Sequence, residues 1–318
     1  MYAALTRSSR DTKRYKISNE RKAAGCGLFC VKLMKKTFLT VFICALLLLL
    51  SGCSRDPEWA GHEKSGLTVA FIDVGKGDCI VISSGEHTMM IDTGYDDTVN
   101  AVKKDLSRLG IDHINELILT HYDKDHYGGA EEILHAYPVD TIYVPDYLPE
   151  GEKYERVMQV LKESRAELCK VKEREEIDFA GTGHEVKITI LPSFTAYDPE
   201  EKNDNDMSLV TELHYGLDSY LFTGDIEKDA IAEFLPEAEH FDILKYPHHG
   251  DWEKNTEELL DQIDPKETVI TDGDTRPVEE DTETYFKAKG KPYYTTYKNG
   301  TIVIFSSGDG NYETLCSH

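Results

Sequence analysis

The most constraining feature of this sequence is a short run of charged and imidazole side chains directly after an apolar stretch. The strand predicted at 115–120 (NELILT) leads into the segment THYDKDHYGG, which holds four potential metal ligands within six residues. They are His121, Asp123, Asp125 and His126. Imidazole and carboxylate together suit first-row divalent metals. Because alternate positions of an extended turn project to one side and His126 points elsewhere, this turn suits two metals better than one tetrahedral cage. The structural alternative is a solvated loop.

The same pattern recurs at three other places. Apolar runs end at Asp92 (MMIDTG), at Asp225 (YLFTGD) and at the pair His248-His249 (ILKYPHHG). Acids and histidines just past strand ends, beside glycines, are where a sheet scaffold gathers a site. The sequence therefore predicts one site assembled from several strands.

Short β-type runs alternate with helical stretches along the chain. Helical spacing is clear at 98–109, where Val99, Val102 and Leu106 share a face and Gly110 follows as a C-cap. Two β-rich halves interleaved with helices fit two packed sheets with helices outside, and no low-complexity linker interrupts them. We therefore predict a single α/β domain over 67–318. Strands are expected at 67–74, 79–83, 88–92, 115–120, 141–145, 185–191, 208–215, 219–225, 241–247, 269–271, 293–296 and 301–305, and helices at 98–109, 152–164, 226–235, 255–263 and 280–289.

The order and identity of these pieces resemble the metallo-β-lactamase superfamily and, within it, the ComEC-like group, the hydrolase domain of competence proteins. The resemblance covers roughly 67–306 and implies a four-layer αββα sandwich with a centre of two divalent metal ions. Six motifs carry it: FIDVGKGD (71–78), IDTG (91–94), LILTHYDKDHYGG (117–129), NDMSLV (205–210), LFTGDI (221–226) and LKYPHHG (244–250).

Carried over position by position, the resemblance implies a division of ligands between the two ions. The implied ligands are His121 and Asp123 for one ion, Asp125, His126 and His248 for the other, and Asp225 as a bridge. His249 would either ligate an ion or meet a substrate oxygen. Such a centre activates water and stabilises the developing charge of an in-line displacement.

The resemblance also implies supporting roles. Asp125, Asp225 and His249 are the implied catalytic residues. Asp92 would orient the ligand turn without binding metal, since ligating groups need fixed partners. Two acids, Asp73 and Asp78, would shape the floor of the site. The candidate substrate contacts are Arg276, Asn205 and Ser208.

Several positions depart from the pattern of the group. The superfamily's ligand turn is HxHxDH, but position 123 is Asp, an oxygen ligand that admits manganese or iron beside zinc. Lys76 stands where the group usually has Gln, and Asp251 where it often has Ser. The later HP pair appears as Arg276-Pro277. Arg276 is a planar double donor that suits phosphate or carboxylate, although a plain surface Arg is the alternative. The usual third-motif His has no clear counterpart.

The amino-terminal segment has the pattern of a targeting signal. From Met34 two lysines precede an apolar run of thirteen residues, Phe38 to Leu50. Such a helix would be roughly 20 Å long, too short for about 30 Å of hydrocarbon but suited to a secretory signal. The ending LSGC resembles the lipobox of bacterial lipoproteins, in which Cys53 is lipidated; the alternative is an uncleaved anchor.

These features predict a lipoprotein signal peptide at 34–52 and a tether at 53–66, with the protein anchored at Cys53 on the extracytoplasmic face of the bacterial membrane. We interpret residues 1–33 as unfolded sequence or as the product of a start codon assigned too early. They are polar, basic and aperiodic.

The net charge of the chain distinguishes between the possible classes of substrate. Residues from 53 onward carry 25 Lys and Arg against 57 Asp and Glu, a formal net charge of −32. A surface this negative repels polyanions, so long nucleic acid is disfavoured. We therefore expect a lipid-anchored, metal-dependent hydrolase of small or envelope-derived phosphoesters that uses two Zn or Mn ions, with Fe possible. The alternatives are a ComEC-like nuclease acting on DNA and a surface binding protein with a degenerate metal site.

Overall fold

The computed structural model describes residues 66–148, 151–200 and 203–318, which belong to one compact unit. The predicted signal peptide at 34–52, the lipidation site Cys53 and nearly all of the predicted tether lie outside the described residues, as does the 1–33 segment. Within the described ranges, every helix is too short or too polar to cross a membrane.

The first of two sheets contains eight strands in the spatial order β15-β14-β1-β2-β3-β4-β5-β6. β3 to β6 run parallel to one another, and the remaining neighbours pair antiparallel. The strands are β1 (Leu67–Phe71), β2 (Ile80–Ser84), β3 (His87–Ile91), β4 (Ile114–Ile118), β5 (Val139–Pro145), β6 (Glu167–Val171), β14 (Ile302–Ser306) and β15 (Tyr312–Cys316).

The second sheet contains seven strands in the order β13-β12-β11-β10-β9-β8-β7. β10 to β13 are parallel, whereas β7, β8 and β9 form antiparallel pairs that join this block at β10. The strands are β7 (Glu175–Phe179), β8 (Val186–Leu191), β9 (Val210–Tyr215), β10 (Asp218–Phe222), β11 (Ile243–Lys245), β12 (Glu267–Ile270) and β13 (Tyr293–Thr295).

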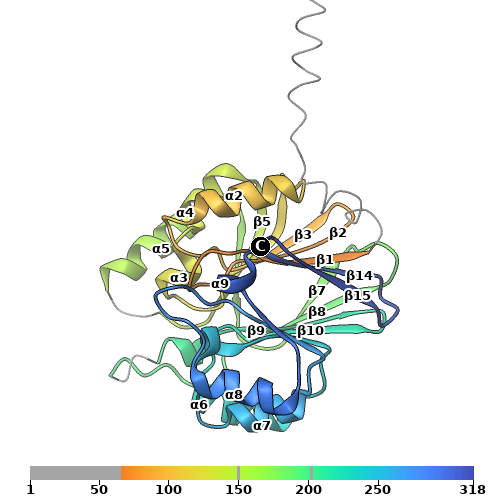
Figure 1. Cartoon of the computed structure of the whole chain (residues 1–318). Helices are drawn as coiled ribbons and strands as arrows, with labels where there is room; N and C mark the ends of the chain where they lie inside the picture. Colours follow the sequence, from red (N-terminus) through yellow and green to blue (C-terminus); the bar gives the residue numbers. More distant parts are fainter. Residues whose placement is uncertain (1–65, 149–150, 201–202) are drawn as a thin grey trace, which may run out of the picture. The chain divides into compact units, whose positions relative to one another are not determined.

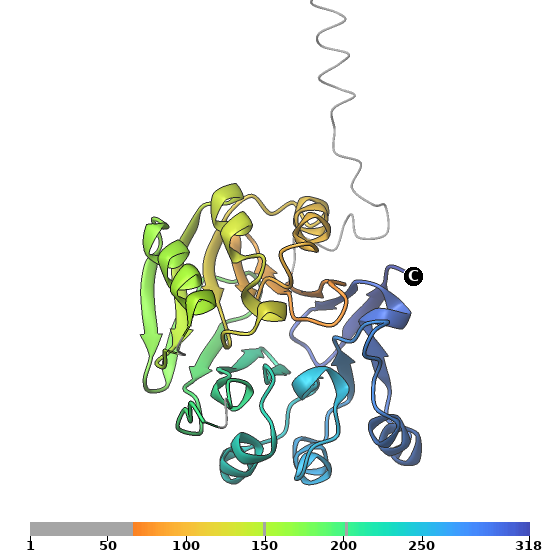
Figure 2. The ribbon, with the colours of Figure 1, turned by 90° about the vertical axis from the view of Figure 1, so that its left-hand side faces the viewer.

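Helices cover the outer face of each sheet, as Figures 1 and 2 show. α2 (Val99–Arg108), α4 (Ala130–Ala136) and α5 (Glu152–Glu163) pack on the first sheet, and α6 (Lys228–Phe234), α7 (Thr256–Ile263) and α8 (Glu280–Lys289) on the second. The expected αββα sandwich is confirmed. The short helices are α3 (Lys124–Tyr127), α9 (Thr296–Asn299), η1 (Asn205–Met207), η2 (Leu235–Glu237) and η3 (Pro247–Gly250).

Three apolar layers hold the sandwich together, and strand periodicity divides the side chains among them. Tyr220 and Phe222 of β10 lie between the sheets, whereas Leu221 lies under the helices of the second sheet. In β1, Phe71 faces the second sheet and Ala70 faces the helices of the first. Successive strand residues point to opposite faces, so a strand covered on both sides reads as a continuous apolar run.

The carboxyl ends of the parallel strands determine where the candidate site lies. The runs expected as strands at 219–225 and 241–247 leave the sheet at Phe222 and Lys245, so their last residues form loops at the carboxyl edge. β3 and β4 are parallel and end at the corresponding edge of the first sheet. Loops at the carboxyl ends of parallel strands are the usual place for a binding site.

Candidate metal centre

The ligand turn between β4 and α3 is anchored by Asp92, which follows β3. Asp92 has a φ of +59° and is fully buried. Its Oδ1 accepts a hydrogen bond from the Thr120 amide at 2.8 Å, and its Oδ2 accepts one from the Thr120 hydroxyl at 2.7 Å. The structure thus places Asp92 where it fixes the start of the turn.

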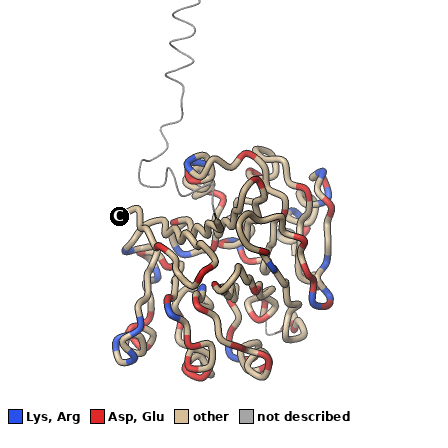
Figure 3. The backbone as a smooth tube through the Cα atoms, turned by 90° about the vertical axis from the view of Figure 1, so that its right-hand side faces the viewer, with Lys and Arg blue, Asp and Glu red and all other residues tan. Residues whose placement is uncertain are grey.

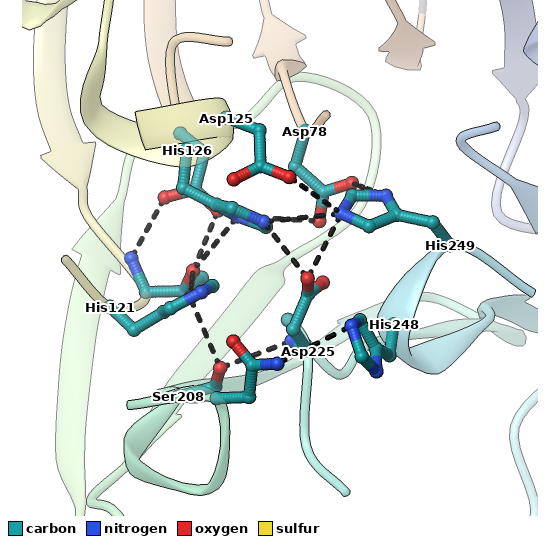
Figure 4. Close-up of polar contacts among 12 residues, drawn as sticks. Asp78, His121, Asp125, His126, Ser208, Asp225, His248 and His249 are labelled. Atoms are coloured by element: carbon teal, nitrogen blue, oxygen red, sulfur yellow. Dashed lines mark hydrogen bonds and ion pairs between the residues drawn. The ribbon is translucent and has the colours of Figure 1, made fainter. Parts of the chain in front are cut away.

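Four buried side chains converge just beyond these strand ends (Figure 4). One ligand atom from each lies within 4.8 Å of the others; the residues are Asp125, His126, Asp225 and His249. Asp225 Oδ2 lies 3.1 Å from His126 Nε2 and 2.9 Å from His249 Nε2. Asp125 Oδ2 lies 3.6 Å from His249 Nε2. Two imidazoles and two carboxylates form a donor set that suits a divalent transition metal.

Hydrogen bonds at the Nδ1 atoms of His126 and His249 orient both rings as ligands. His126 Nδ1 lies 2.8 Å from Asp92 Oδ2, and His249 Nδ1 lies 2.8 Å from the Thr271 carbonyl oxygen. Because an ionised carboxylate and a carbonyl can only accept, each Nδ1 carries the proton. Each Nε2 therefore faces the cluster, where it presents a lone pair to a metal ion once it has lost its proton.

His121 lies beside this cluster. Its ring centroid is 4.1 Å from that of His126, and its Nδ1 lies 3.2 Å from the Ser208 hydroxyl. Among the described residues its buried Nε2 has no hydrogen-bond partner. Burial lowers the pKa of His121 to about 4, so the ring is neutral at physiological pH. An orphaned, neutral imidazole nitrogen fits a metal ligand. Asp123, the other expected ligand of this ion, is half-buried and outside the cluster of four.

The consecutive histidines of η3 point in different directions. Both have positive φ, 44° at His248 and 54° at His249. Only His249 enters the cluster, whereas His248 groups with Glu227 and Glu253 and lies 3.3 Å from the Asn205 amide nitrogen. The structure therefore places His249, rather than the expected His248, beside the other expected ligands of the second ion; which of the two histidines binds an ion stays a prediction.

The charge network contains a buried ammonium that sequence reasoning missed. Lys245 is fully buried, and its Nζ lies 2.5 Å from Asp78 Oδ2 and 3.3 Å from Asp225 Oδ1. Asp78 also accepts a hydrogen bond from the Thr271 hydroxyl at 2.5 Å. It therefore links the loop before β2 to the ends of β11 and β12. The available signal was a lysine inside the otherwise apolar run ILKYP (243–247).

The loop before β2 shapes this floor. Asp73 Oδ1 accepts a hydrogen bond from the Gly75 amide at 3.1 Å, which closes the loop without reaching the cluster. The Asp78 amide donates to the Asp125 carbonyl at 3.1 Å. Of the two acids expected at the floor, Asp78 thus touches the ligand network and Asp73 shapes the chain that carries it.

The buried charges stabilise one another. Burial alone would raise the pKa of Asp225, but His126, His249 and Lys245 hold it well below its usual value. Burial would lower the pKa of His126 and of His249, yet nearby carboxylates, Asp225 foremost, raise both. Such mutually shifted groups are typical of functional sites. The carboxylates favour positive charge at this point, whether from protons or from a cation.

The three candidate substrate contacts differ in their surroundings. Ser208 is fully buried, and its hydroxyl accepts a hydrogen bond from the Asp225 amide at 3.0 Å, so it positions ligands rather than facing a substrate. Asn205 donates to Glu227 Oε1 at 2.7 Å beside His248. Arg276 is half-exposed and donates to Asp251.

Comparison with known proteins shows relatives among competence proteins. Residues 72–198 match the Metallo-beta-lactamase superfamily. ComE operon protein 3 of Bacillus subtilis is 30% identical over 225 residues, covering 64% of this chain and 28% of that protein. Recombination protein 2 of Haemophilus influenzae is 27% identical over 252 residues, covering 78% of this chain and 28% of that protein. The chain spans less than a third of the length of either relative.

Solved structures share the fold. The metallo-beta-lactamase fold protein YhfI from Bacillus subtilis is 13% identical with a TM-score of 0.51, covering 75% of this chain and 99% of that one. Tm1679, a metal-dependent hydrolase of the beta-lactamase superfamily, is 15% identical with a TM-score of 0.50, covering 74% and 98%. At these identities the likeness shows the fold alone. The superfamily match at 72–198 shows a metallo-β-lactamase domain, and the relatives by sequence are competence proteins.

Proposed function

We propose that this chain is a metal-dependent hydrolase of phosphoester bonds, held by a lipid on Cys53 at the extracytoplasmic face of a bacterial membrane. One observation carries the catalytic part: Asp125, His126, Asp225 and His249 converge, with the Nε2 atoms of both imidazoles facing the cluster. The anchoring part is supported by the sequence at 34–53 alone.

Two divalent ions would be bound by these residues as follows. Asp125, His126 and His249 would hold one ion, His121 and Asp123 the other, and Asp225 would serve both. Zinc and manganese both suit this mixture of nitrogen and oxygen donors. Bound ions would supply an activated water nucleophile and stabilise charge on the phosphoryl group.

The protein's own groups prepare the centre for that chemistry. Asp92 and the Thr271 carbonyl hold the Nδ1 protons of His126 and His249. Lys245 contacts the carboxylate of Asp225, and the Ser208 hydroxyl accepts a hydrogen bond from its backbone amide. Because the donors need no reorganisation, the centre is preorganised for its cation and for the charge that develops in reaction.

The negative charge of the molecule supports a small substrate. In the view of Figure 3, basic positions are scattered among acidic ones rather than joined in a stripe. Together with the net charge of −32 from residue 53 onward, this disfavours a long polyanion.

The competence-protein relatives favour the second candidate, a nuclease acting on DNA.

Metal content and substrate range test the proposal. We would purify the full chain in mild detergent without a metal-binding tag, measure metals by elemental analysis, and assay bis-p-nitrophenyl phosphate, p-nitrophenyl phosphate, p-nitrophenyl phosphorylcholine and short single-stranded DNA with Mn or Zn. About two ions per chain are expected, with ester hydrolysis that the Asp225→Asn variant reduces by at least about 100-fold. The exposed Asp96 offers a control, Asp96→Asn, with unchanged hydrolysis.

The other outcomes separate the alternatives. Cleavage of DNA at a higher kcat/KM than any small ester would favour the nuclease. A folded chain that contains no metal and hydrolyses none of these substrates would favour a surface binding protein with a degenerate site.

A further inference from the structure

Lys76 lies at the solvent side of the cluster. Its Nζ is 3.0 Å from Asp125 Oδ2, and its side chain is 17% exposed. The Asp125 side chain is 12% exposed, whereas those of His249 and Asp225 are 0% and 2% exposed. Since exposure rises only in this direction among these groups, an external ligand would reach the cluster past Asp125 and Lys76.

A second cation is held at the same rim by the loop after β12. A Cβ at Gly273 would lie 2.5 Å from the Lys76 backbone nitrogen, so this loop packs directly on the loop that carries Lys76. The Arg276 amide donates to the Gly273 carbonyl at 3.2 Å. Arg276 is therefore fixed close to Lys76, with its guanidinium directed to Asp251 and its side chain 51% exposed.

Both cations retain unused donors. Within the described residues, Lys76 Nζ makes one hydrogen bond, to Asp125, although an ammonium has three donors. In the described part of the chain, the Arg276 guanidinium has five donors and one partner, Asp251. Asp251 is almost fully buried and fixes the orientation of that planar group. Two preorganised cations with free donors suit the oxygens of a phosphate group.

We propose that Lys76 and Arg276 together bind the anionic oxygens of a terminal phosphate, so that the substrate is a phosphomonoester dianion rather than a phosphodiester. The inference rests on the proposed function and names its substrate class. A diester has one anionic charge at phosphorus and a second bulky substituent, and it therefore gains less from two added cations.

Kinetics and phosphate binding test this pair on the full-length, metal-loaded protein. The variants are Lys76→Gln and Arg276→Gln. The controls are Lys287→Gln and Arg156→Gln, since Lys287 and Arg156 are exposed and pair with Glu283 and Glu131. Inorganic phosphate is titrated by calorimetry, and KM and kcat are measured for p-nitrophenyl phosphate and bis-p-nitrophenyl phosphate.

Each rim variant should weaken phosphate binding and raise the KM of the monoester by about 10- to 100-fold, because a charged hydrogen bond is lost. The diester KM should change by less than about threefold, and Lys76→Arg should retain most of the phosphate affinity. Metal content should stay at the parent value in both rim variants.

Three results would overturn the inference: unchanged phosphate affinity, equal effects on both esters, or metal loss in Lys76→Gln, which would mean that Lys76 only positions Asp125. Arg276→Gln changes a half-exposed side chain, so it decides the question even where Lys76→Gln folds poorly. A parent that hydrolyses neither ester but binds phosphate through these two side chains would refute the proposed function and support the phosphate pair.

Discussion

At the scale of single residues, the adjacent histidines of η3 give the sharpest test of the metal centre. His249→Asn should lower the metal content of the purified chain, because it removes an imidazole whose Nε2 faces the cluster. His248→Asn should leave metal content unchanged, because His248 groups with Glu227 and Glu253 outside the cluster. Elemental analysis and calorimetric titration with Zn²⁺ measure the difference, which we expect to exceed about tenfold in affinity.

These two variants control for one another, since both replace a buried histidine in the same turn. Metal loss in His248→Asn with retention in His249→Asn would restore the assignment expected from the motif. The sequence could not decide between them, because consecutive side chains in an extended segment simply alternate. The positive φ at both residues, which directs His249 inward, depends on the packed loops around η3.

The buried ammonium of Lys245 gives a second prediction at this scale. Lys245→Met should lower the free energy of unfolding of the metal-free protein by about 3–5 kcal/mol, because it leaves Asp78 and Asp225 without their buried cation. Urea unfolding measures this quantity. In the double variant with Asp78→Asn, the loss should be smaller than the sum of the single losses. Additive losses would show that the two side chains do not interact.

At the scale of elements, glycines hold the ligand turn against its neighbours by close contact. Gly77 has no positive φ, yet a Cβ there would lie 2.7 Å from the Asp125 carbonyl oxygen. Gly77→Ala should therefore push the 73–78 loop away from the ligand turn, lowering both metal affinity and the free energy of unfolding by about 1–3 kcal/mol. Calorimetric titration and urea unfolding measure the two effects.

A matched control is Gly310→Ala, where the φ of +88° is strained for alanine but no atom lies within 4 Å of the added Cβ. It should cost stability through its backbone conformation and leave metal affinity unchanged. Equal metal affinity in Gly77→Ala and the parent would show that the loop and the turn move independently.

The elements that sequence patterns predicted are those buried on both faces. Largely apolar runs predicted β1, β4 and β10, because each packs between a helix layer and the other sheet. The strands without such a prediction, β6, β7 and β15, are all edge strands of the two sheets. β6 and β15 are largely half-buried or exposed, so their own side chains carry little apolar pattern. Their strand conformation comes from backbone pairing with an inner neighbour.

At the scale of the whole molecule, the site depends on strands contributed by both halves of the chain. Asp92, Asp125 and His126 come from loops of the first sheet, and Asp225 and His249 from loops of the second. The sequence predicted this convergence from the shared position of these residues past strand ends. The lysine at 245 was visible in the sequence, but its pairing with Asp78 was not predictable, because the pair forms only once the two sheets are packed.

The pH dependence of stability tests the whole charge network. In the metal-free protein the pKa values of His126 and His249 are raised above the unfolded-state value near 6.5. Their contribution is therefore complete below about pH 6.5 and is lost as pH rises through the folded-state pKa values. His121, with its pKa lowered to about 4, affects stability only between about pH 4 and 6.5. From pH 7 to 9 the contribution of His126 and His249 therefore falls while that of His121 stays constant. The thiol of Cys79, whose pKa burial raises, adds a fall of its own toward pH 9.

Bound metal should reverse this trend, because neutral imidazole is the ligand form and metal binding then competes with fewer protons. We expect the free energy of unfolding in a chelator to fall from pH 7 to 9, and the stabilisation by saturating Zn²⁺ to grow over the same range. Urea unfolding at several pH values measures both. Groups that titrate independently of the centre affect both forms equally and cancel in the difference. The same pH slope with and without metal would show that His126 and His249 neither hold raised pKa values nor bind the ion.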